Sequence, residues 1–391
     1  MTLPRFIQIH TLTSYPATLL NRDDAGLAKR VPFGNATRTR ISSQCLKRHW
    51  RRAEGVYALS EIEGIEMSVR SRRIFEDLIA QPLLEEGLEE ESLRVVLKSL
   101  QAAVLGESAK AKAGKKEGII TLETNQVIVL GRPEIEFIKE AARTILRDGQ
   151  GKKEAAARVN VYLKENKKNI AALKKAAGAG LDAAIFGRMV TSDILARGDA
   201  AIHVAHAFTV HQEETESDYF TAVDDLVAEA GELGSGHINE SELTSGLFYG
   251  YVVVDLPQLV SNIEGVERSE FEQADREIVT QILNRLLRLI SQVSPGAKKG
   301  STAPYAYAEM IMLESGNRQP RTLANAFREP VAPSLEAAIT ALGGYLKSFD
   351  LMYGKGEDRR ICAIQDTAVV PAQGVSSVDE IAGWVSELLR G

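Results

Sequence analysis

The 391-residue sequence predicts an α+β fold. Three observations support this prediction. Strand-like segments occur near both ends of the chain, helix-forming sequence rich in Ala, Glu, Lys and Leu fills residues 61–180, and an acidic, irregular segment occupies 213–246. Helices that lie between strands early and late in a chain, with insertions in the middle, are typical of a layered α+β domain.

Strands are predicted where apolar residues alternate or β-branched residues cluster. In the first strand, 5–13, Ile7 and Ile9 fall on one face because strand side chains alternate with a period of two. The segment 14–41 that follows is expected to be a long loop, and long loops in compact domains are often functional. The other strand-like segments are 119–130, 180–193, 201–214, 247–256 and 304–313.

Helices are predicted late in the chain from capping and periodicity. Ser269 and Glu272 form a capping-box pattern that opens a helix over 269–293, and Pro295 ends it. Two more helices are expected at 335–350 and 378–390. The buried stripe of the first of these three helices includes Ile278, Ile282 and Leu286.

The acidic segment 213–246 lies between two strand-like runs, so we expect a projecting hairpin arm there. A four-stranded RRM-like sheet with elaborations fits the whole order of strands and helices. Periodicity alone leaves other α+β folds open.

Composition excludes several classes of protein. The chain has two cysteines, Cys45 and Cys362, so neither a disulfide framework nor a cysteine-based zinc site is available. No apolar run approaches the ~20 residues of a membrane span, and the first residues lack a signal-peptide pattern. Phosphate-binding glycine loops, nucleophile elbows and zinc-protease motifs are missing from the sequence. We therefore expect a soluble, reduced, cytoplasmic protein.

A basic segment interrupts this acidic protein of net charge −6. Residues 20–52 hold nine Lys or Arg against Asp23 and Asp24, a local charge of +7. Clustered cations gain free energy by releasing the counterions condensed on phosphates, so the segment predicts a polyanion site. Its cations are Arg22, Lys29, Arg30, Arg38, Arg40, Lys47, Arg48, Arg51 and Arg52.

The end of this segment predicts a helix capped by Ser42 or Ser43. At about 100° per residue, the buried arc holds Leu46, Trp50 and Ala53, whereas Gln44, Lys47, Arg48 and Arg51 share the opposite arc. The free N–H groups and positive dipole end of the helix add a further anion site. A solvated amphipathic helix with no ligand explains the same charges equally well.

A second basic segment covers 152–175, which contains eight Lys or Arg and only two Glu. Such a helix binds nucleic acid through its backbone without reading sequence, but lysine-rich helices are more often simply soluble surface.

Two groups of residues invite a metal-site interpretation. Asp23 and Asp24 are adjacent carboxylates, but without a nearby His or Glu we favour a salt bridge with Arg22 or Lys29. His203 and His206 lie on opposite faces if their segment is a strand, so we favour hydrogen-bonded structural histidines there.

Motifs spread over most of the chain resemble the CasC family, the guide-RNA-binding backbone subunits of the type I-E CRISPR surveillance complex, Cascade. The resemblance is weakest at about 61–180 and after about 330. The motifs are NRDD (21–24), FG (33–34), R-x-R-I-S-S-Q-x-L-K-R (38–48), G-R-M-x-T-S (187–192), A-H-A (205–207), H-Q (211–212), F-T-A-V-D-D-L (220–226), S-G-x-F-Y (245–249), P-G-A-K (295–298) and A-N-A-F (324–327).

The resemblance implies a right-hand architecture: an RRM-like (ferredoxin-like) palm, a helical fingers insertion and a β-hairpin thumb. Copies would polymerise along the guide, and each thumb would displace one nucleotide at a regular interval. The implied parts are the palm at 1–60, 181–212 and 247–391, the last including the C-terminal helices, the fingers at 61–180 and the thumb at 213–246.

The resemblance also implies roles for individual residues. The residues expected to bind RNA are Arg22, Ser42, Gln44, Lys47, Arg48, Arg51, Arg188 and Met189. The thumb wedge comprises Tyr219, Phe220, Thr221 and Ile238, and Met189 is implied to contribute to it, since apolar or aromatic groups can replace base stacking without reading the base. Lysines expected to face target DNA are Lys164, Lys167, Lys168, Lys298 and Lys299.

The partners implied are the CRISPR guide RNA, target DNA through the guide, further copies of the chain, the other Cascade subunits and, indirectly, a helicase–nuclease. No catalysis, cofactor, metal or membrane contact is implied. The alternative is a metal-dependent nuclease that uses Asp23 and Asp24 with His10 or His211. A third option is a protein-binding α+β subunit whose basic face is incidental.

Overall fold

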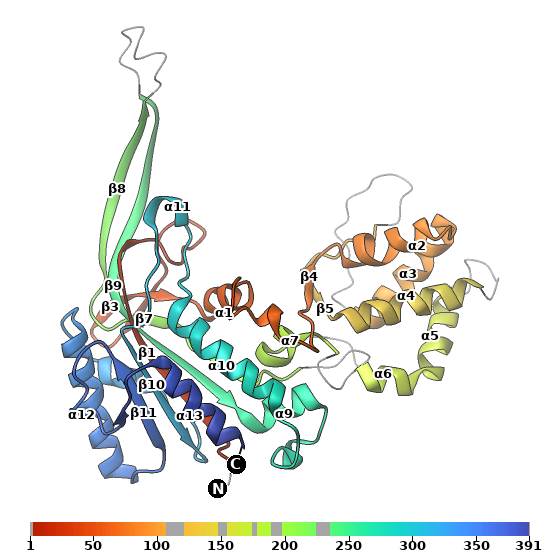
Figure 1. The fold of residues 1–391 in the computed structure, drawn as a ribbon. Helices are drawn as coiled ribbons and strands as arrows, with labels where there is room; N and C mark the ends of the chain where they lie inside the picture. The colour runs from red at the N-terminus through yellow and green to blue at the C-terminus, as the bar shows by residue number, and fades with distance from the viewer. Residues whose placement is uncertain are drawn as a thin grey trace. The chain divides into compact units, whose positions relative to one another are not determined.

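The computed structural model describes residues 3–106, 121–147, 155–173, 178–188, 198–223 and 235–390 (Figure 1). The chain divides into two compact units. The sheet unit consists of Met1–Ala58, His203–Val254 and Leu283–Gly391, and the helical unit of Leu59–Ile202 and Asp255–Ile282. The predicted α+β class is confirmed. The RRM-like palm and the finer division of the chain into palm, fingers and thumb stay predictions.

The sheet unit is built on a sheet of ten strands among the described residues. Its strand order is β12-β11-β10-β1-β9-β7-β3-β2, and β6 and β8 also pair with β9. The strands are β1 (Phe6–Thr18), β2 (Arg30–Phe33), β3 (Ala36–Ile41), β6 (Ile202–Val204), β7 (Ala207–Thr209), β8 (Glu214–Val223), β9 (Ser235–Asp255), β10 (Met310–Gly316), β11 (Asp358–Ala363) and β12 (Gln373–Gly374).

Helices cover both faces of this sheet (Figure 1). Leu12 of β1 packs in one cluster with Leu342 and Leu346 of α12, while Ile9 lies on the opposite face with Trp50 of α1 and Ile290 of α10. The helices are α1 (Ser43–Arg51), most of α10 (Glu277–Gln292), α11 (Lys299–Thr302), the short η6 (Ala324–Phe327), α12 (Leu335–Tyr353) and α13 (Val378–Arg390).

A buried ionic network crosses the strands of the sheet unit. Glu314 of β10 accepts hydrogen bonds from Arg321 at 2.6 and 2.8 Å and from Arg359 at 2.7 Å, and His10 lies 3.1 Å away. Burial alone would raise the pKa of Glu314, but the hydrogen bonds and charges of Arg321 and His10 hold that pKa well below its usual value. The carboxylate therefore stays ionised inside the fold.

The helical unit has its own core, formed mainly by stripes on α3 and α4. Leu93, Leu97 and Leu100 of α3 recur at helical spacing and are fully buried. Its elements are η1 (Leu59–Glu61), β4 (Val69–Ser71), the π-helical η2 (Ile74–Ala80), α2 (Gln81–Glu85), α3 (Glu90–Leu105), β5 (Ile128–Leu130), α4 (Arg132–Arg147), α5 (Ala155–Glu165), α6 (Lys167–Leu173), α7 (Leu181–Phe186), α9 (Leu256–Glu264) and η5 (Arg268–Glu270).

The first strand, the helix after Ser42 and the two C-terminal helices form as predicted. The long loop predicted at 14–41 is wrong in part, because β1 continues to Thr18 and β2 and β3 form a hairpin. Gly34 turns this hairpin at a φ of 62°, and a Cβ there would lie 1.7 Å from the carbonyl oxygen of Arg328. A distant loop thus requires glycine at the turn.

The prediction of a strand at 180–193 is also wrong, because Leu181–Phe186 forms helix α7 and 189–193 lie outside the described residues. Asp182 on this helix accepts hydrogen bonds from the backbone N–H of Ser68 at 2.7 Å and from the guanidinium of Arg70. These contacts join segments more than 100 residues apart, so local periodicity cannot reveal them.

The helix predicted at 269–293 begins instead at Glu277. Residues 271–276 form a turn in which the guanidinium of Arg276 donates to the carbonyls of Phe271, Glu272 and Ala274. The carboxylate of Asp275 then accepts the backbone N–H of Glu277 at 3.0 Å and starts the helix. The capping box lies one turn earlier, between Glu267 and Glu270.

Four strand predictions also differ from the structure in their boundaries. The segment 201–214 is broken into β6 and β7, and the strand predicted at 304–313 starts only at Met310. The predicted arm and the strand after it are joined, since β9 is one strand of 21 residues. Within 119–130, only Ile128–Leu130 is a described strand, and it pairs with β4.

Candidate nucleic-acid interface

Hydrogen bonds of Ser42 fix the N-terminus of helix α1. The hydroxyl oxygen of Ser42 accepts the backbone N–H of Cys45 at 3.3 Å, which caps the helix as predicted. The backbone N–H of Ser42 donates to the side-chain oxygen of Asn21 at 2.9 Å, so the cap is tied to the loop that carries Arg22. Ser42 itself is buried, and its geometry is that of a structural cap.

The two faces of α1 divide as the helical spacing predicts. Trp50 is buried, and Leu46 packs with Cys45 against the apolar cluster around Tyr15 and Phe248. On the opposite face, the side chains of Gln44 and Arg48 are exposed and those of Lys47 and Arg51 are half-buried. The apolar face fixes the orientation of the helix and leaves the basic face directed outward.

Two cations from other segments add positive charge around α1. Burial lowers the pKa of His49 on α1, and the charges of Lys299 and Arg48 lower it further. Burial raises the pKa of Cys45, while the charges of Arg48 and Lys29 oppose that rise. Lys29 before β2 and Lys299 in α11 therefore lie near α1, and together with Arg48 they create a positive potential around it.

Sequence reasoning did not assign Lys29 to RNA binding, although it counted this residue in the basic segment. The sequence indicates a role for Lys29 only weakly, because this residue lies in a loop, where no helical or strand period shows which way a side chain points. Burial lowers the pKa of His206, and the charges of Arg40 and Lys29 contribute to this shift. The positive region thus extends from α1 to the end of β3.

Three arginines of the basic segment have structural partners instead. Arg38 is fully buried, and its guanidinium donates to the carbonyls of Thr209 at 3.0 Å and Phe327 at 2.9 Å. Arg30 forms ion pairs with Glu213 and Glu242. The Nε of Arg40 donates to the carbonyl of Arg30 at 3.0 Å. The local charge of +7 therefore overstates the charge that faces solvent.

Asp23 shapes the loop before β2. Its carboxylate accepts the backbone N–H groups of Ala25 at 2.9 Å and Leu27 at 3.0 Å, the arrangement of an Asx turn. Neither Asp23 nor Asp24 forms an ion pair among the described residues, so the expected salt bridge with Arg22 or Lys29 is wrong. The backbone of Arg22 forms an isolated antiparallel β-bridge with Ala28 in this loop, and Arg22 is exposed.

The histidines are hydrogen-bonded rather than gathered into a site. The buried His211 donates from Nδ1 to the carbonyl of Gln212 at 2.6 Å and accepts the backbone N–H of Leu247 at Nε2. His206 lies 3.0 Å from the guanidinium of Arg40. Within the described residues, no group of three or more His, Cys, Asp or Glu is arranged to hold a metal.

Arg188, expected to bind RNA, has a different environment in the helical unit. It is buried and forms a two-point ion pair with Glu134 at 2.6 and 2.8 Å, and it also donates to the carbonyl of Val129 at 3.1 Å. A guanidinium held in this way does not reach a phosphate, so the structure gives Arg188 a structural role. Met189 lies outside the described residues.

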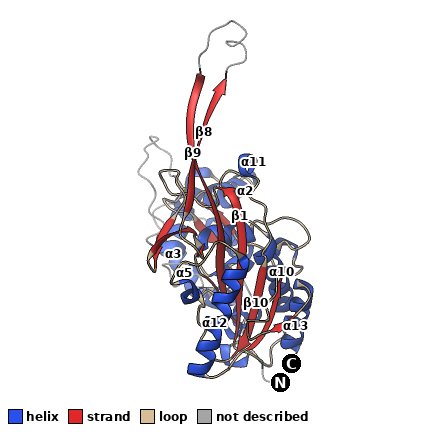
Figure 2. Ribbon diagram, turned by 90° about the vertical axis from the view of Figure 1, so that its left-hand side faces the viewer, coloured by secondary structure: helices blue, strands red, loops and turns tan. Residues whose placement is uncertain are grey.

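The predicted arm is an antiparallel hairpin of β8 with the first half of β9, and it projects from the sheet unit (Figure 2). Tyr219 lies opposite Glu240 and is 63% exposed. In the backbone register, Thr221 pairs with Ile238 and Phe220 pairs with Asn239. The side chains of Phe220, Thr221 and Ile238 lie outside the described part of the structure, so the wedge stays a prediction.

The lysines expected to face DNA fall into two groups. Lys164 of α5 and Lys167 and Lys168 of α6 are exposed on the helical unit. Lys298 occupies the N-cap position of α11, and Lys299 is exposed in the first turn. The second group lies in the sheet unit, where Lys299 contributes to the potential around α1.

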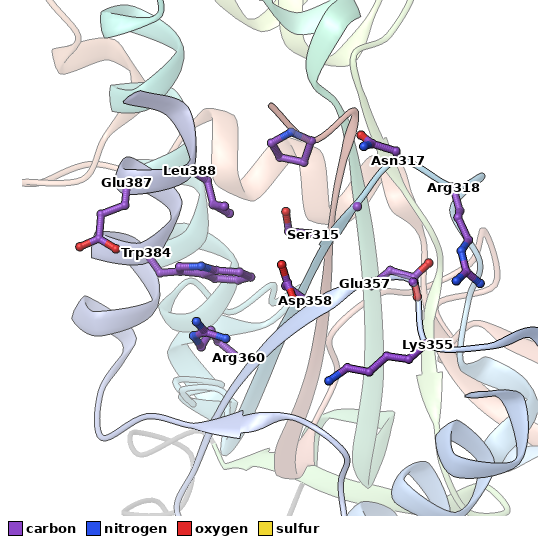
Figure 3. A pocket seen from close by; sticks show the side chains of 13 residues that line it. Ser315, Asn317, Arg318, Lys355, Glu357, Asp358, Arg360, Trp384, Glu387 and Leu388 are labelled. Atoms are coloured by element: carbon purple, nitrogen blue, oxygen red, sulfur yellow. The ribbon is translucent and has the colours of Figure 1, made fainter. Parts of the chain in front are cut away.

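A cavity in the sheet unit lies outside the sequence predictions (Figure 3). It has a volume of about 1090 Å³ and opens between α13 and the ends of β10 and β11. The guanidinium of Arg360 lies 4.7 Å from the ring centre of Trp384, and Lys355 and Glu387 also line the cavity. Its mixed charges favour no single sign of ligand.

The sequence model of the CT1975-like protein family matches residues 7–390. The chain belongs to this family. Its fold is similar to that of a chain from a "CRISPR RNA-guided surveillance complex, pre-nicking", with 26% identity, a TM-score of 0.77 and coverage of 98% of this chain and 100% of the other. A chain of a "CRISPR RNA-guided surveillance complex" shares the fold at 20% identity and a TM-score of 0.55, covering 98% and 99% of the two chains. Comparison with curated proteins finds no match.

Proposed function

We propose that this chain is a non-catalytic RNA-binding backbone subunit of a type I-E CRISPR surveillance complex. The observation that carries the proposal is the basic face of α1, which is oriented by buried Trp50 and reinforced by Lys29 and Lys299. Similarity to surveillance-complex chains over almost the whole length supports the same assignment.

The α1 face suits phosphates better than bases. Its cations Lys47, Arg48 and Arg51, together with Arg22, supply charge without a shaped pocket, and the capped helix N-terminus adds a positive dipole end. Contacts of this kind hold a nucleic-acid backbone and carry no sequence information. We infer that the guide RNA is held independently of its sequence.

The hairpin supports a further part of the proposal. β8 and β9 project from the sheet, and the exposed Tyr219 lies on this arm. In the proposed assembly, copies of the chain line up along the guide and each hairpin displaces one nucleotide, leaving the others to pair with target DNA. Other Cascade subunits complete the complex in the cytoplasm, and a separately recruited helicase–nuclease cuts the target.

The alternative function, a metal-dependent nuclease, has less support. The carboxylate of Asp23 is used by two backbone N–H groups of its own loop. His10 and His211 are buried, and each is hydrogen-bonded within the sheet unit. Among the described residues, Asp23, Asp24, His10 and His211 are not arranged to share one metal ion.

The experiment that tests the proposal measures binding of the purified protein to unstructured single-stranded RNAs of increasing length, at several salt concentrations. Stoichiometry that rises stepwise with length, indifference to sequence and a steep salt dependence are expected. Saturation at one copy, or a requirement for one sequence, would contradict a polymerising backbone. Metal-dependent cleavage of the RNA would favour the nuclease instead.

A further inference from the structure

Two tyrosines that the proposed function does not use stand exposed in the connection between α11 and β10. Tyr305 is 73% and Tyr307 68% exposed, whereas Pro304 before them is buried and Ala306 between them is half-buried. This alternation is that of an extended segment whose aromatic side chains point to one side, away from the protein.

The backbone of this segment is held firmly. The hydroxyl of Ser294 accepts the N–H of Ala306 at 2.9 Å and donates to the carbonyl of the same residue at 2.8 Å. The N–H of Ala308 donates to the carbonyl of Ser291 at 2.7 Å. The exposed rings are therefore carried by a fixed segment and cannot simply turn inward to become buried.

The two side chains leave the backbone at a spacing that one nucleobase can occupy. Side chains two residues apart on an extended segment lie about 6.4–6.8 Å apart. Stacked bases are spaced by about 3.4 Å, so a base between the rings would stack on both. Each base presents a π-face, and such stacking therefore tolerates any sequence.

The segment packs against the apolar side of α1. Ala306 packs in the same apolar cluster as Cys45 and Leu46 of α1, and Lys299 of the preceding helix lies near His49. Exposed tyrosines are also common where two proteins meet, but lysine is depleted from such interfaces. Aromatic rings beside a positive groove are the combination that single-stranded nucleic acid requires.

We propose that Tyr305 and Tyr307 form a stacking site for one unpaired base of the RNA whose phosphates lie on α1. This inference rests on the proposed function, because it needs RNA at the α1 surface. It adds a contact to the base at a place remote from the hairpin wedge in the sequence, and this contact is aromatic rather than electrostatic.

The test compares the double variants Y305L/Y307L and Y305F/Y307F with the wild type, using unstructured single-stranded RNA and an abasic strand of the same length. Leucine removes the π-face and phenylalanine keeps it. Loss of one stacked base should weaken RNA binding about 5- to 150-fold in the leucine variant. The phenylalanine variant should keep wild-type affinity. Tyr353→Leu, at an exposed tyrosine at the end of α12, is the matched control.

Two further readouts identify stacking. The leucine variant should keep the salt dependence of the wild type, since no phosphate contact is lost, and it should bind the abasic strand as the wild type does. An equal loss for RNA and the abasic strand would overturn the proposal, because the tyrosines would then act through the backbone or the fold.

The remaining outcomes separate this inference from the proposed function. Wild-type affinity for RNA in the leucine variant would refute the stacking site and leave the RNA-binding function intact. Absence of RNA binding by the wild type would refute both. A change in self-association of the RNA-free protein in the leucine variant, with RNA affinity unchanged, would assign the tyrosines to contact with a second copy and refute stacking.

Discussion

Neutralising the outward face of α1 should weaken RNA binding through charge alone. The perturbation is the triple variant K47Q/R48Q/R51Q, in which glutamine preserves helix propensity. None of the three side chains is fully buried, so the variant should fold, and a thermal unfolding curve checks this.

The magnitude follows from counterion release. Each phosphate contact to a single strand contributes about 0.7 to the slope of log affinity against log salt, so losing three should reduce that slope by about 2.1. Between 50 and 200 mM salt, a slope change of this size alters the ratio of wild-type to variant affinity about 18-fold. The difference between the proteins should thus shrink as salt rises.

The assay is RNA binding at a series of salt concentrations, with K347Q/K355Q/R390Q as the control. These three cations are exposed elsewhere on the sheet unit, and their removal changes the net charge equally. The control should keep the wild-type slope. Equal slopes for both triple variants would refute the reasoning, because the effect would then come from net charge and not from contacts at α1.

The remaining predictions concern stability and are checked by chemical or thermal unfolding. Ser42→Ala should cost about 0.5–2 kcal/mol because the N-cap hydrogen bond is lost, and Ser42→Asn should restore most of it. Gly34→Ala should cost ~1–3 kcal/mol or more, since its φ is 62° and its Cβ would meet the carbonyl of Arg328. Its control, Gly344→Ala in α12, meets no atom within 4 Å and should stabilise by about 0.4–1 kcal/mol. Glu314→Gln should cost about 3–5 kcal/mol by leaving two arginines without their buried carboxylate. Because the folded-state pKa of Glu314 lies below its usual 4.5, the stability it contributes is present above pH 4.5 and is lost as the pH falls through the lower folded-state value. The variant should therefore show a weaker loss of stability in acid than the wild type, and an unchanged acid dependence would contradict this assignment.

The local features of the candidate site could be predicted from the sequence. The helical period separates Trp50 from Arg48, and a serine at the start of α1 supplies its cap, because both depend on residues within a few positions. The same reasoning predicted the first strand and the acidic hairpin. What periodicity could not show was that β9 is continuous, because the acidic, irregular segment up to 246 and the apolar run at 247–256 differ in composition.

The sequence alone thus determined the α+β class, the amphipathic face of α1 and the family resemblance. The tertiary structure decided which charges reach solvent. Arg38 donates to carbonyls more than 170 residues away, and Arg188 is paired with Glu134, 54 residues earlier in the sequence. The physical reason is that periodicity and capping act between neighbours along the chain, whereas burial of a charge depends on partners that only the folded chain brings together.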